Sequence, residues 1–390
     1  MVFFMHYSRP MTMAMASCSG GEVPGQIVLV LQGGGALGAY QVGVYQALHE
    51  AGAEPDWVIG TSIGAINGAI IAGNRHAERL AKLDQFWDKL RLSPTFELMA
   101  APWARHWYGN FATTVSGVPA FFTPRAIPWG GIYAPLGVYA SSWYRTEALE
   151  QTLAGLLEPE LFAHRAPRLT VGAVGVTSGE LAYFDSARCQ LELEHVMASG
   201  ALPPAFPAIR VDGEPYWDGG IYSNTPIEAV MDDHPRRDSV IFNVNVWQAQ
   251  GPAPNSIWEV LGRQKNIQYA SRAESHIARQ KQLHRMRHII RSLKHRLPPE
   301  ALEDPDLLDL TAHGCGTTMH VVRLLAPEHD GDDYTKDIDF SSDGIRARRE
   351  AGYADARAML SRAPWRAPVD PMEGVIIHQD APMSERLAKS

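Results

Sequence analysis

Ser62 has the local sequence that activates a serine for nucleophilic attack. It lies in Gly60-Thr61-Ser62-Ile63-Gly64, after the β-forming Trp57-Val58-Ile59 and before an apolar run of small residues from Ala65 to Ala72. A glycine-flanked serine between strand and helix is typical of a nucleophile elbow, because the sharp turn leaves no room for Cβ atoms on either side and exposes the hydroxyl. The chemistry predicted for Ser62 is therefore acyl transfer through a covalent intermediate.

A glycine-rich turn upstream of Ser62 is a candidate oxyanion hole. The turn Gly33-Gly34-Gly35-Ala36-Leu37-Gly38 follows the β-forming run from Ile27 to Leu31. Backbone N–H groups at the mouth of a helix stabilise the oxyanion of a tetrahedral intermediate, and removing one such donor typically lowers the rate by ~10²- to 10³-fold. We therefore expect Gly33, Gly34 and Gly35 to hold the oxyanion.

Asp218 is the favoured base for Ser62. A serine hydroxyl is a poor nucleophile until a base within hydrogen-bonding reach takes its proton. Asp218 ends a strand-like stretch in Tyr216-Trp217-Asp218-Gly219-Gly220, where the glycines allow a tight turn and close backbone approach. Asp-Gly is also a common turn signal without catalytic meaning. A histidine triad stays open through His234, His313 and His320, which follow Asp218 but have no distinctive context.

The glycine-rich turn also satisfies Gly-x-Gly-x-x-Gly, the pattern of a dinucleotide site. That interpretation expects an acid about 20 residues further on, at the end of the second strand. Glu54 and Asp56 precede Trp57-Val58-Ile59 instead, and the end of that strand carries the serine turn. The pattern therefore favours an oxyanion loop over a nucleotide site.

Together these blocks resemble the patatin-like phospholipase family. Members of this family carry a glycine-rich oxyanion loop, a Gly-x-Ser-x-Gly turn and an Asp-Gly-Gly or Asp-Gly-Ala turn, in the order found here. The segment from Ala198 to Pro207 is similar to the segment that precedes the family's aspartate, and the resemblance runs from about Ile27 to Val246. The chain departs from the pattern at Leu37, where the family usually has arginine or lysine.

The resemblance implies a fold and a mechanism. The fold is α/β, a three-layer α/β/α arrangement with a mainly parallel central sheet. Ser62 and Asp218 would form a two-residue dyad that works through an acyl-enzyme, with no cofactor and no metal. The implied substrates are acyl esters of lipids, phospholipids and lysophospholipids first. Intracellular polyesters and short acyl esters stay open, as do an acyltransferase with the same serine and a noncatalytic lipid-binding module.

The order of apolar runs predicts how the chain is organised. Strands alternating with helix-period segments are typical of βαβ units. The expected elements are strands at 27–31, 57–59, 169–177, 181–184, 240–246 and 319–325 and a helix at 36–51. We expect residues 1–25 to be a disordered leader, residues 26–250 to form the catalytic domain and residues 251–390 to form a helical C-terminal extension packed on the core.

Three segments outside the motifs have distinctive compositions. Residues 94–145 are rich in aromatics, prolines and glycines without a sustained period, which is typical of a lid-like insertion or of an aromatic-stapled surface loop. Residues 262–296 are helix-like and basic, with an apolar stripe of Leu283, Met286, Ile290 and Leu293. That stripe predicts packing on the sheet, with contact to anionic lipid as the alternative. A later helix, within 341–362, should dock through Ala347, Ala351, Ala354 and Ala358.

Composition limits the classes of partner and compartment. The net charge of −8, with 20% charged residues, gives no electrostatic case for nucleic acid. The three cysteines are odd in number and lack metal-ligand spacing, so we expect no disulfide framework and a reducing, cytoplasmic location without export. No apolar run approaches the ~20 residues that span a bilayer, which leaves peripheral membrane contact open. The sequence also leaves a homo-oligomer open.

Overall fold

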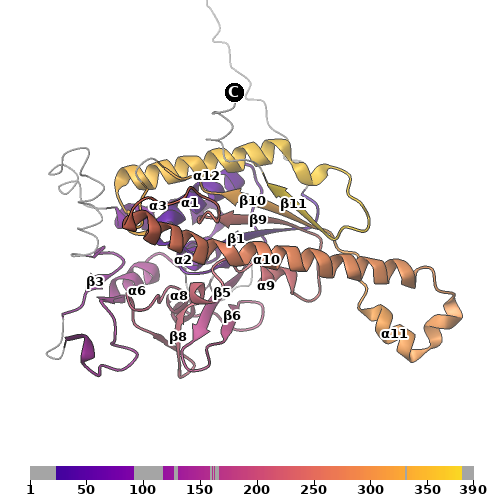
Figure 1. Cartoon of the computed structure of the whole chain (residues 1–390), viewed down its shortest axis with the longest axis horizontal. Coiled ribbons are helices and arrows are strands. Elements are labelled where there is room, and N and C mark those ends of the chain that lie inside the picture. Colours follow the sequence, from indigo (N-terminus) through magenta and orange to yellow (C-terminus); the bar gives the residue numbers. More distant parts are fainter. Residues whose placement is uncertain are drawn as a thin grey trace, which may run out of the picture.

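A mixed nine-stranded sheet runs through the protein (Figure 1). The computed structural model describes residues 23–91, 117–126, 131–158, 160, 162, 167–329 and 332–379, without the side chains of 271–273. The sheet contains β1 (Gln26–Leu31), β2 (Trp57–Gly60), β5 (Arg168–Gly175), β6 (Leu181–Asp185), β7 (Ile209–Val211), β8 (Glu214–Asp218), β9 (Ser239–Asn245), β10 (Met319–Leu325) and β11 (Val375–Gln379). Two short strands, β3 (Thr123–Pro124) and β4 (Tyr144–Arg145), pair separately.

The sheet is mainly parallel. Its strands follow the order β11-β10-β9-β1-β2-β5-β8-β7, and β6 also pairs with β5. All pairs from β11 to β5 are parallel, whereas β6, β7 and β8 form antiparallel pairs. The α/β fold expected from the sequence is therefore confirmed. The parallel arrangement brings the carboxyl ends of β11, β10, β9, β1 and β2 to one edge of the sheet, where ligand sites of open α/β sheets usually lie.

Helices cover both faces of the sheet. The α-helices are α1 (Ala39–Glu50), α2 (Ile63–Ala72), α3 (Arg79–Leu90), α6 (Glu147–Ala154), α8 (Leu193–Ser199), α9 (Glu228–Met231), α10 (Ile257–Lys294), α11 (Pro305–Ala312) and α12 (Ser342–Arg362). Alternate residues of β1 enter different cores, as the period of a strand requires. Leu29 and Leu31 join the core with α1, α2 and α12, whereas Val28 and Val30 join the core with α9 and α10. The result is the expected three-layer arrangement.

The C-terminal part of the chain belongs to the sheet itself. Strands β10 and β11 extend the sheet beyond β9, and α12 packs against α1. The two helices approach so closely that a Cβ atom added at Gly43 of α1 would lie 1.9 Å from the carbonyl oxygen of Arg349 in α12. Residues after 250 therefore build part of the core rather than only covering it.

The docking face of α12 differs from the predicted one. Its buried residues are Ile345, Arg348, Gly352, Ala356 and Met359, and the predicted alanine stripe is only half-buried at the edge of this face. The spacing of the alanines predicted the wrong face because the close approach of α12 to α1 depends on glycines instead. A Cβ atom added at Gly352 would lie 2.0 Å from the carbonyl oxygen of Tyr40.

The predicted packing of α10 on the sheet through its apolar stripe is wrong. The side chains of Leu283, Met286 and Leu293 are 41%, 58% and 56% exposed. The buried face of this half of α10 carries one apolar residue, Ile277, and three polar ones, Gln280, His284 and His288. Polar side chains are tolerated there where they find partners. Gln280 donates to Asp232 at 2.7 Å, and both ring nitrogens of His288 lie within hydrogen-bonding distance of backbone carbonyls.

Several sequence predictions lie wholly or partly outside the described residues. These are the leader up to residue 22 and most of the aromatic insertion, including Trp103, Trp107, Tyr108, Phe111 and Trp129. Within the described part of the insertion, Phe121 and Phe122 are buried, whereas Tyr133 and Trp143 are exposed. Among the described helices, none is both long enough and apolar enough to cross a membrane.

Candidate active site

Ser62 occupies a strained turn between β2 and α2. Its backbone has φ 57° and ψ −126°, a positive φ that non-glycine residues rarely adopt. The flanking glycines are required by close backbone contacts. A Cβ atom added at Gly60 would lie 2.3 Å from the carbonyl oxygen of Gly64, and one added at Gly64 would lie 2.3 Å from that of Leu31. The turn therefore has the geometry that the sequence predicted, and the strain lies where strained residues often serve function.

The elbow is anchored by its neighbours. The Ser62 N–H donates to the backbone carbonyl and to the hydroxyl of Ser199, both at 3.1 Å. Ser199 ends α8, within the segment that the sequence singled out before the aspartate. The Thr61 hydroxyl donates to the Ser223 carbonyl at 3.3 Å. These contacts tie the elbow to the chain on both sides of Asp218.

Asp218 lies at the end of β8, beside Ser62. Its backbone N–H donates to the carbonyl of Ala201 at 3.0 Å, and its Oδ1 accepts from the N–H of Gly220 at 2.7 Å. The side chain is only 2% exposed. Burial raises the pKa of Asp218 to about 7, although hydrogen bonds from the Gly220 N–H and the Ser62 side chain lower it in part. The structure thus brings together a serine and a carboxyl group that titrates near neutral pH.

The glycine loop borders the same space, and its three glycines differ. The N–H of Gly33 donates to the Asn224 carbonyl at 3.1 Å, and its own carbonyl accepts from Asn224 Nδ2 at 3.0 Å. Gly34 and Gly35 donate to no acceptor among the described residues. A Cβ atom at Gly35, which has φ +54°, would lie 2.2 Å from the Asp337 carbonyl oxygen. Gly33 therefore anchors the loop, and the N–H groups of Gly34 and Gly35 are the available donors.

Two residues that the sequence analysis missed hold this loop in position. Gln32 is fully buried, and its Oε1 accepts from the N–H groups of Val246 and Trp247 at 2.6 and 3.0 Å. The Trp247 indole N–H donates to the Gly33 carbonyl at 2.8 Å. No motif identifies either side chain, because the partners follow β1 and β9, which are neighbours in the sheet but lie more than 200 residues apart in the sequence.

Ser62 and Asp218 open onto an apolar cavity of about 210 Å³. Its walls include Ile63, Ile66, Leu202, Phe121, Phe122, Phe206 and Phe340. The rings of Phe121 and Phe122 contact Phe206 with centroid distances of 6.0 and 5.4 Å. Part of the aromatic insertion therefore forms the wall of the cavity next to the serine. Such a lining fits an acyl chain rather than a polar group.

The C-terminal part completes this cavity. Tyr269 of α10 and Asp337 of the short helix η7 (Lys336–Ile338) lie in its wall. The Tyr269 ring packs on Trp247 with a centroid distance of 5.1 Å, and Asp337 pairs with Lys265 at 2.8 Å. Burial, with the charges of Asp218 and Asp337, raises the pKa of Tyr269 to about 12. The sequence analysis did not predict this contribution.

The histidines proposed for a triad lie elsewhere. No histidine is among the cavity-lining residues of the described chain. His234 lies beside Arg236 in a polar loop, and His313 follows the end of α11. Nδ1 of His320 lies 2.9 Å from Nε2 of His378 on the neighbouring strand. The geometry therefore brings Asp218, and none of these three histidines, to Ser62.

One group of side chains in the described chain has ligand atoms close enough for a metal ion. The group consists of His49, Glu54 and His76, whose ligand atoms lie within 4.8 Å of one another. Glu54 also pairs with Arg79 at 2.6 Å, and this positive charge opposes a cation. None of these residues lines the cavity beside Ser62 and Asp218.

A patatin-like phospholipase family model matches residues 29–231, more than half of the chain. The chain therefore belongs to the patatin-like phospholipase family. A second model, described as patatin phospholipase, matches residues 267–372. The first match covers the elbow and Asp218, and the second covers much of the C-terminal part, including Tyr269 and Asp337.

Similar proteins share short stretches with this chain. Patatin-like phospholipase domain-containing protein 6 from Homo sapiens is 49% identical over 63 residues, which are 16% of this chain and 5% of that protein. Lysophospholipase nte1 from Aspergillus terreus is 64% identical over 44 residues, 11% of this chain and 3% of that protein. The chain thus matches only a small fraction of these relatives' length. The crystal structure of VipD from Legionella pneumophila aligns with 94% of this chain and 74% of its own, at 16% identity and a TM-score of 0.37.

Proposed function

We propose that this protein is a serine acyl hydrolase that cleaves acyl esters of lipids through Ser62 and Asp218. The observation that carries the proposal is the contact between the Ser62 side chain and the buried carboxyl group of Asp218, at the mouth of an apolar cavity. Family membership supports lipid esters as the substrate class. The names of the relatives, a lysophospholipase and a patatin-like phospholipase, agree with this class.

The first half of the proposed reaction forms an acyl-enzyme. The Asp218 carboxylate takes the hydroxyl proton as Ser62 Oγ bonds to the ester carbonyl carbon, and the carbonyl electron pair moves onto its oxygen. The N–H groups of Gly34 and Gly35 face this oxyanion. The intermediate collapses, the bond from carbon to the alkoxy oxygen breaks, and the alcohol leaves with the proton from Asp218.

The second half regenerates the enzyme. Water attacks the acyl-enzyme and gives a proton to Asp218, and the new tetrahedral intermediate expels Ser62 Oγ. The proton returns from Asp218 to Ser62, and the carboxylic acid is released. A base with a pKa near the working pH suits both directions of transfer, and the pKa of about 7 for Asp218 supports this role.

The exposed face of α10 supports peripheral contact with a lipid surface. Leu283, Met286 and Leu293 are exposed on the same helix as Arg279 and Arg285, which pair with no acid among the described residues. In Figure 1 this half of α10 extends beyond the sheet toward α11. An apolar stripe flanked by arginine is the pattern of a helix that lies on anionic lipid.

The test of the hydrolase proposal is covalent labelling with a fluorophosphonate probe, followed by mass mapping of the modified peptide. An activated Ser62 reacts with the probe and carries the label, and Ser62→Ala protein stays unlabelled. Asp218→Asn should slow the labelling of Ser62 strongly, because the base is gone. Labelling of another serine, or unchanged labelling in Asp218→Asn, would count against the proposed pair.

A further inference from the structure

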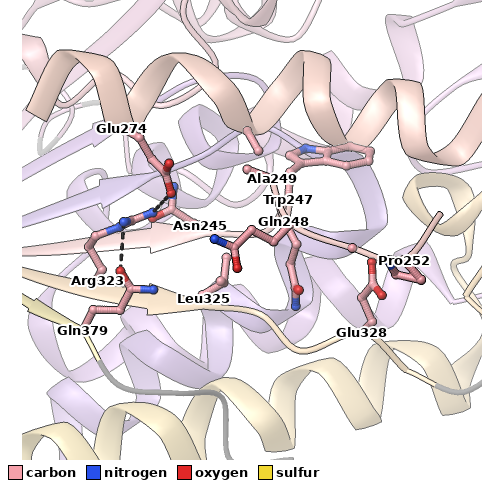
Figure 2. Close-up of a pocket in the computed structure, with 13 residues that line it drawn as sticks. Asn245, Trp247, Gln248, Ala249, Pro252, Glu274, Arg323, Leu325, Glu328 and Gln379 are labelled. Atoms are coloured by element: carbon pink, nitrogen blue, oxygen red, sulfur yellow. Dashed lines mark hydrogen bonds and ion pairs between the residues drawn. The ribbon is translucent and has the colours of Figure 1, made fainter. Parts of the chain in front are cut away.

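Two further hollows adjoin the catalytic cavity, the space beside Ser62, and they differ in charge. The first, the polar cavity, encloses about 660 Å³ and is lined by the segment after β9, the ends of β10 and β11, and α10 (Figure 2). Trp247 lines both this cavity and the catalytic one. Arg323 is the one cation among its described lining residues, and it donates to Gln379 at 2.9 Å and to Glu274 at 3.1 Å. The charge of this cation is therefore already balanced within the protein.

The second hollow, the ribbon groove, lies against the two-stranded ribbon of β3 and β4. It encloses about 250 Å³, and its described lining is largely apolar. Ile132, Leu136 and Trp143 are large apolar side chains of this lining that are exposed. An aliphatic chain that covers such side chains removes apolar surface from water, which stabilises the bound state. The groove therefore suits a hydrocarbon chain.

The ribbon separates this groove from the catalytic cavity, because successive residues of a strand point to opposite faces. Tyr144 lines the catalytic cavity, whereas the preceding Trp143 lines the groove. The adjoining segment divides in the same way, since Pro204 lines the groove and Ala205 lines the catalytic cavity. The carbonyls of Pro204 and Ala205 accept from the N–H groups of Trp143 and Tyr144 at 3.1 and 2.9 Å. A ligand in the groove is therefore a separate molecule from one in the catalytic cavity.

Arg125 brings a positive charge to the groove. Its backbone N–H donates to the carbonyl of Trp143 at 2.8 Å, which continues the pairing of the ribbon and puts both side chains on one face. Arg125 is the one cation among the described lining residues, and it forms no ion pair within the described chain. Its Nε is buried without a partner, whereas Nη1 and Nη2 are not among the buried atoms and so are accessible from the groove. A guanidinium held partly out of water without an acid favours a bound anion.

We propose that the ribbon groove binds an aliphatic carboxylate, with the chain on the apolar side chains of the lining and the carboxylate on the Nη groups of Arg125. A guanidinium and a carboxylate match in bidentate geometry. The polar cavity does not lead to the same inference, because Arg323 already has its partners. The proposed hydrolase reaction releases carboxylates of this kind, and the inference rests on the proposed function only for the source of the ligand.

The experiment is photolabelling with an octanoate analogue that carries a diazirine at the end of its chain, followed by mass mapping of the labelled peptides. The label should appear within residues 131–143, because the chain lies on their apolar side chains. Unlabelled octanoate should compete for this label about tenfold better than octanol, which lacks the charge that Arg125 binds. Label confined to peptides of the catalytic cavity, such as the one that contains Ile63 and Ile66, would overturn the proposal.

Matched variants separate the groove from general surface charge. Arg125→Gln should weaken the apparent affinity for octanoate about five- to twentyfold, because it removes charge-assisted hydrogen bonds. Arg145→Gln changes an exposed arginine of β4, two residues from Trp143, that does not line the groove, and it should leave this affinity unchanged. Ala134→Phe, which fills the groove, should abolish the label, whereas Ala140→Phe in the same segment but outside the lining should preserve it.

The alternative occupant of this face is an anionic lipid surface. Such a surface would attract both arginines, so Arg125→Gln and Arg145→Gln would lower sedimentation with phosphatidylglycerol vesicles equally while octanoate affinity stayed unchanged, and that result overturns the proposal. Hydrolysis of p-nitrophenyl laurate without label in the groove overturns the inference and leaves the hydrolase proposal intact. Label in the groove without turnover above that of Ser62→Ala does the reverse.

Discussion

The two cavities at the carboxyl edge of the sheet differ in how their residues are distributed along the chain. The catalytic cavity depends on short motifs, since Ser62 and Asp218 each lie in a glycine turn at the end of a strand. The polar cavity has no motif, and its lining combines the segment after β9 with the ends of β10 and β11 and with α10. The proposed reaction centre therefore has a local signature in the sequence, whereas a cavity assembled from several distant segments does not.

The largest effects are expected within the catalytic cavity. Ser62→Ala and Asp218→Asn should each lower kcat at least ~10³-fold, and the double variant should cost little more than either change alone, because nucleophile and base act as a unit. The measurement is steady-state hydrolysis of p-nitrophenyl laurate by the three variants, with circular dichroism to establish folding. Additive losses in the double variant would mean that the two residues act separately.

The pH dependence should be the next largest effect. Burial raises the pKa of Asp218 to about 7, and only the carboxylate accepts the Ser62 proton. The rate at which Ser62 attacks an acyl ester or a probe should therefore fall about tenfold per pH unit below that value. The measurement is the rate of fluorophosphonate labelling of Ser62 between pH 5 and 9. A rate independent of pH across this range would contradict Asp218 as the base.

Stability should respond to the same group with a defined sign. The pKa of Asp218 is higher in the folded protein than its ordinary 3.8, so the folded state binds more protons between pH 4 and 7 and loses stability as the pH rises through that range. Asp218→Asn removes this loss. The free energy of unfolding of the variant relative to wild type should therefore increase by roughly 2–3 kcal/mol from pH 5 to pH 8. Denaturant titrations at both pH values measure it, and an unchanged difference would argue against the raised pKa.

The local motifs explain how much of the site could be predicted. Ser62 and the glycines around it were predictable because steric contact at a tight turn restricts each position to a particular residue type. Asp218 was predictable as the acid of a third such turn. Tyr269 and Asp337 were not, because they reach the cavity from the C-terminal part through contacts across the fold. The distinction between Gly33 and its two neighbours also required the Asn224 contacts, which no local pattern contains.

The fold shows the same division between local and long-range information. The strands at the centre of the sheet were predictable because buried parallel strands are continuous apolar runs. The buried face of α10 was not, since Gln280 and His288 are buried through specific hydrogen bonds while Leu283 and Met286 remain exposed. Hydrophobic periodicity identifies the face of a helix only when burial follows hydropathy.

Gln32 offers a way to perturb both cavities at once. Its side chain accepts from the N–H groups of Val246 and Trp247, and Trp247 is the wall between the cavities. Gln32→Leu leaves two buried N–H groups without an acceptor, which should lower the free energy of unfolding by about 2–4 kcal/mol and kcat/KM by about tenfold. Chemical denaturation and p-nitrophenyl laurate hydrolysis measure the two effects.

The matched control for Gln32 is Gln151→Leu on the surface of α6, which should change neither quantity appreciably. If Gln32→Leu lowers the free energy of unfolding but leaves kcat/KM for p-nitrophenyl laurate unchanged, the position of Trp247 does not depend on Gln32. The cavities would then be independent of this buried link.

The smallest expected effect concerns the exposed face of α10 around Arg285, whose residues line neither cavity. If this helix lies on anionic lipid, Arg285 contributes about 1 kcal/mol to binding at moderate salt, so Arg285→Gln should weaken partitioning about fivefold. The measurement is sedimentation with vesicles of phosphatidylcholine containing phosphatidylglycerol, across a salt series and in a Ser62→Ala background that prevents turnover. Screening should weaken binding as salt rises.

The control is Arg346→Gln, which changes an exposed arginine of α12 on the other side of the sheet and should have no effect on vesicle binding. Binding that is equal on neutral and anionic vesicles, or insensitive to Arg285→Gln, would leave α10 without a role at the lipid surface.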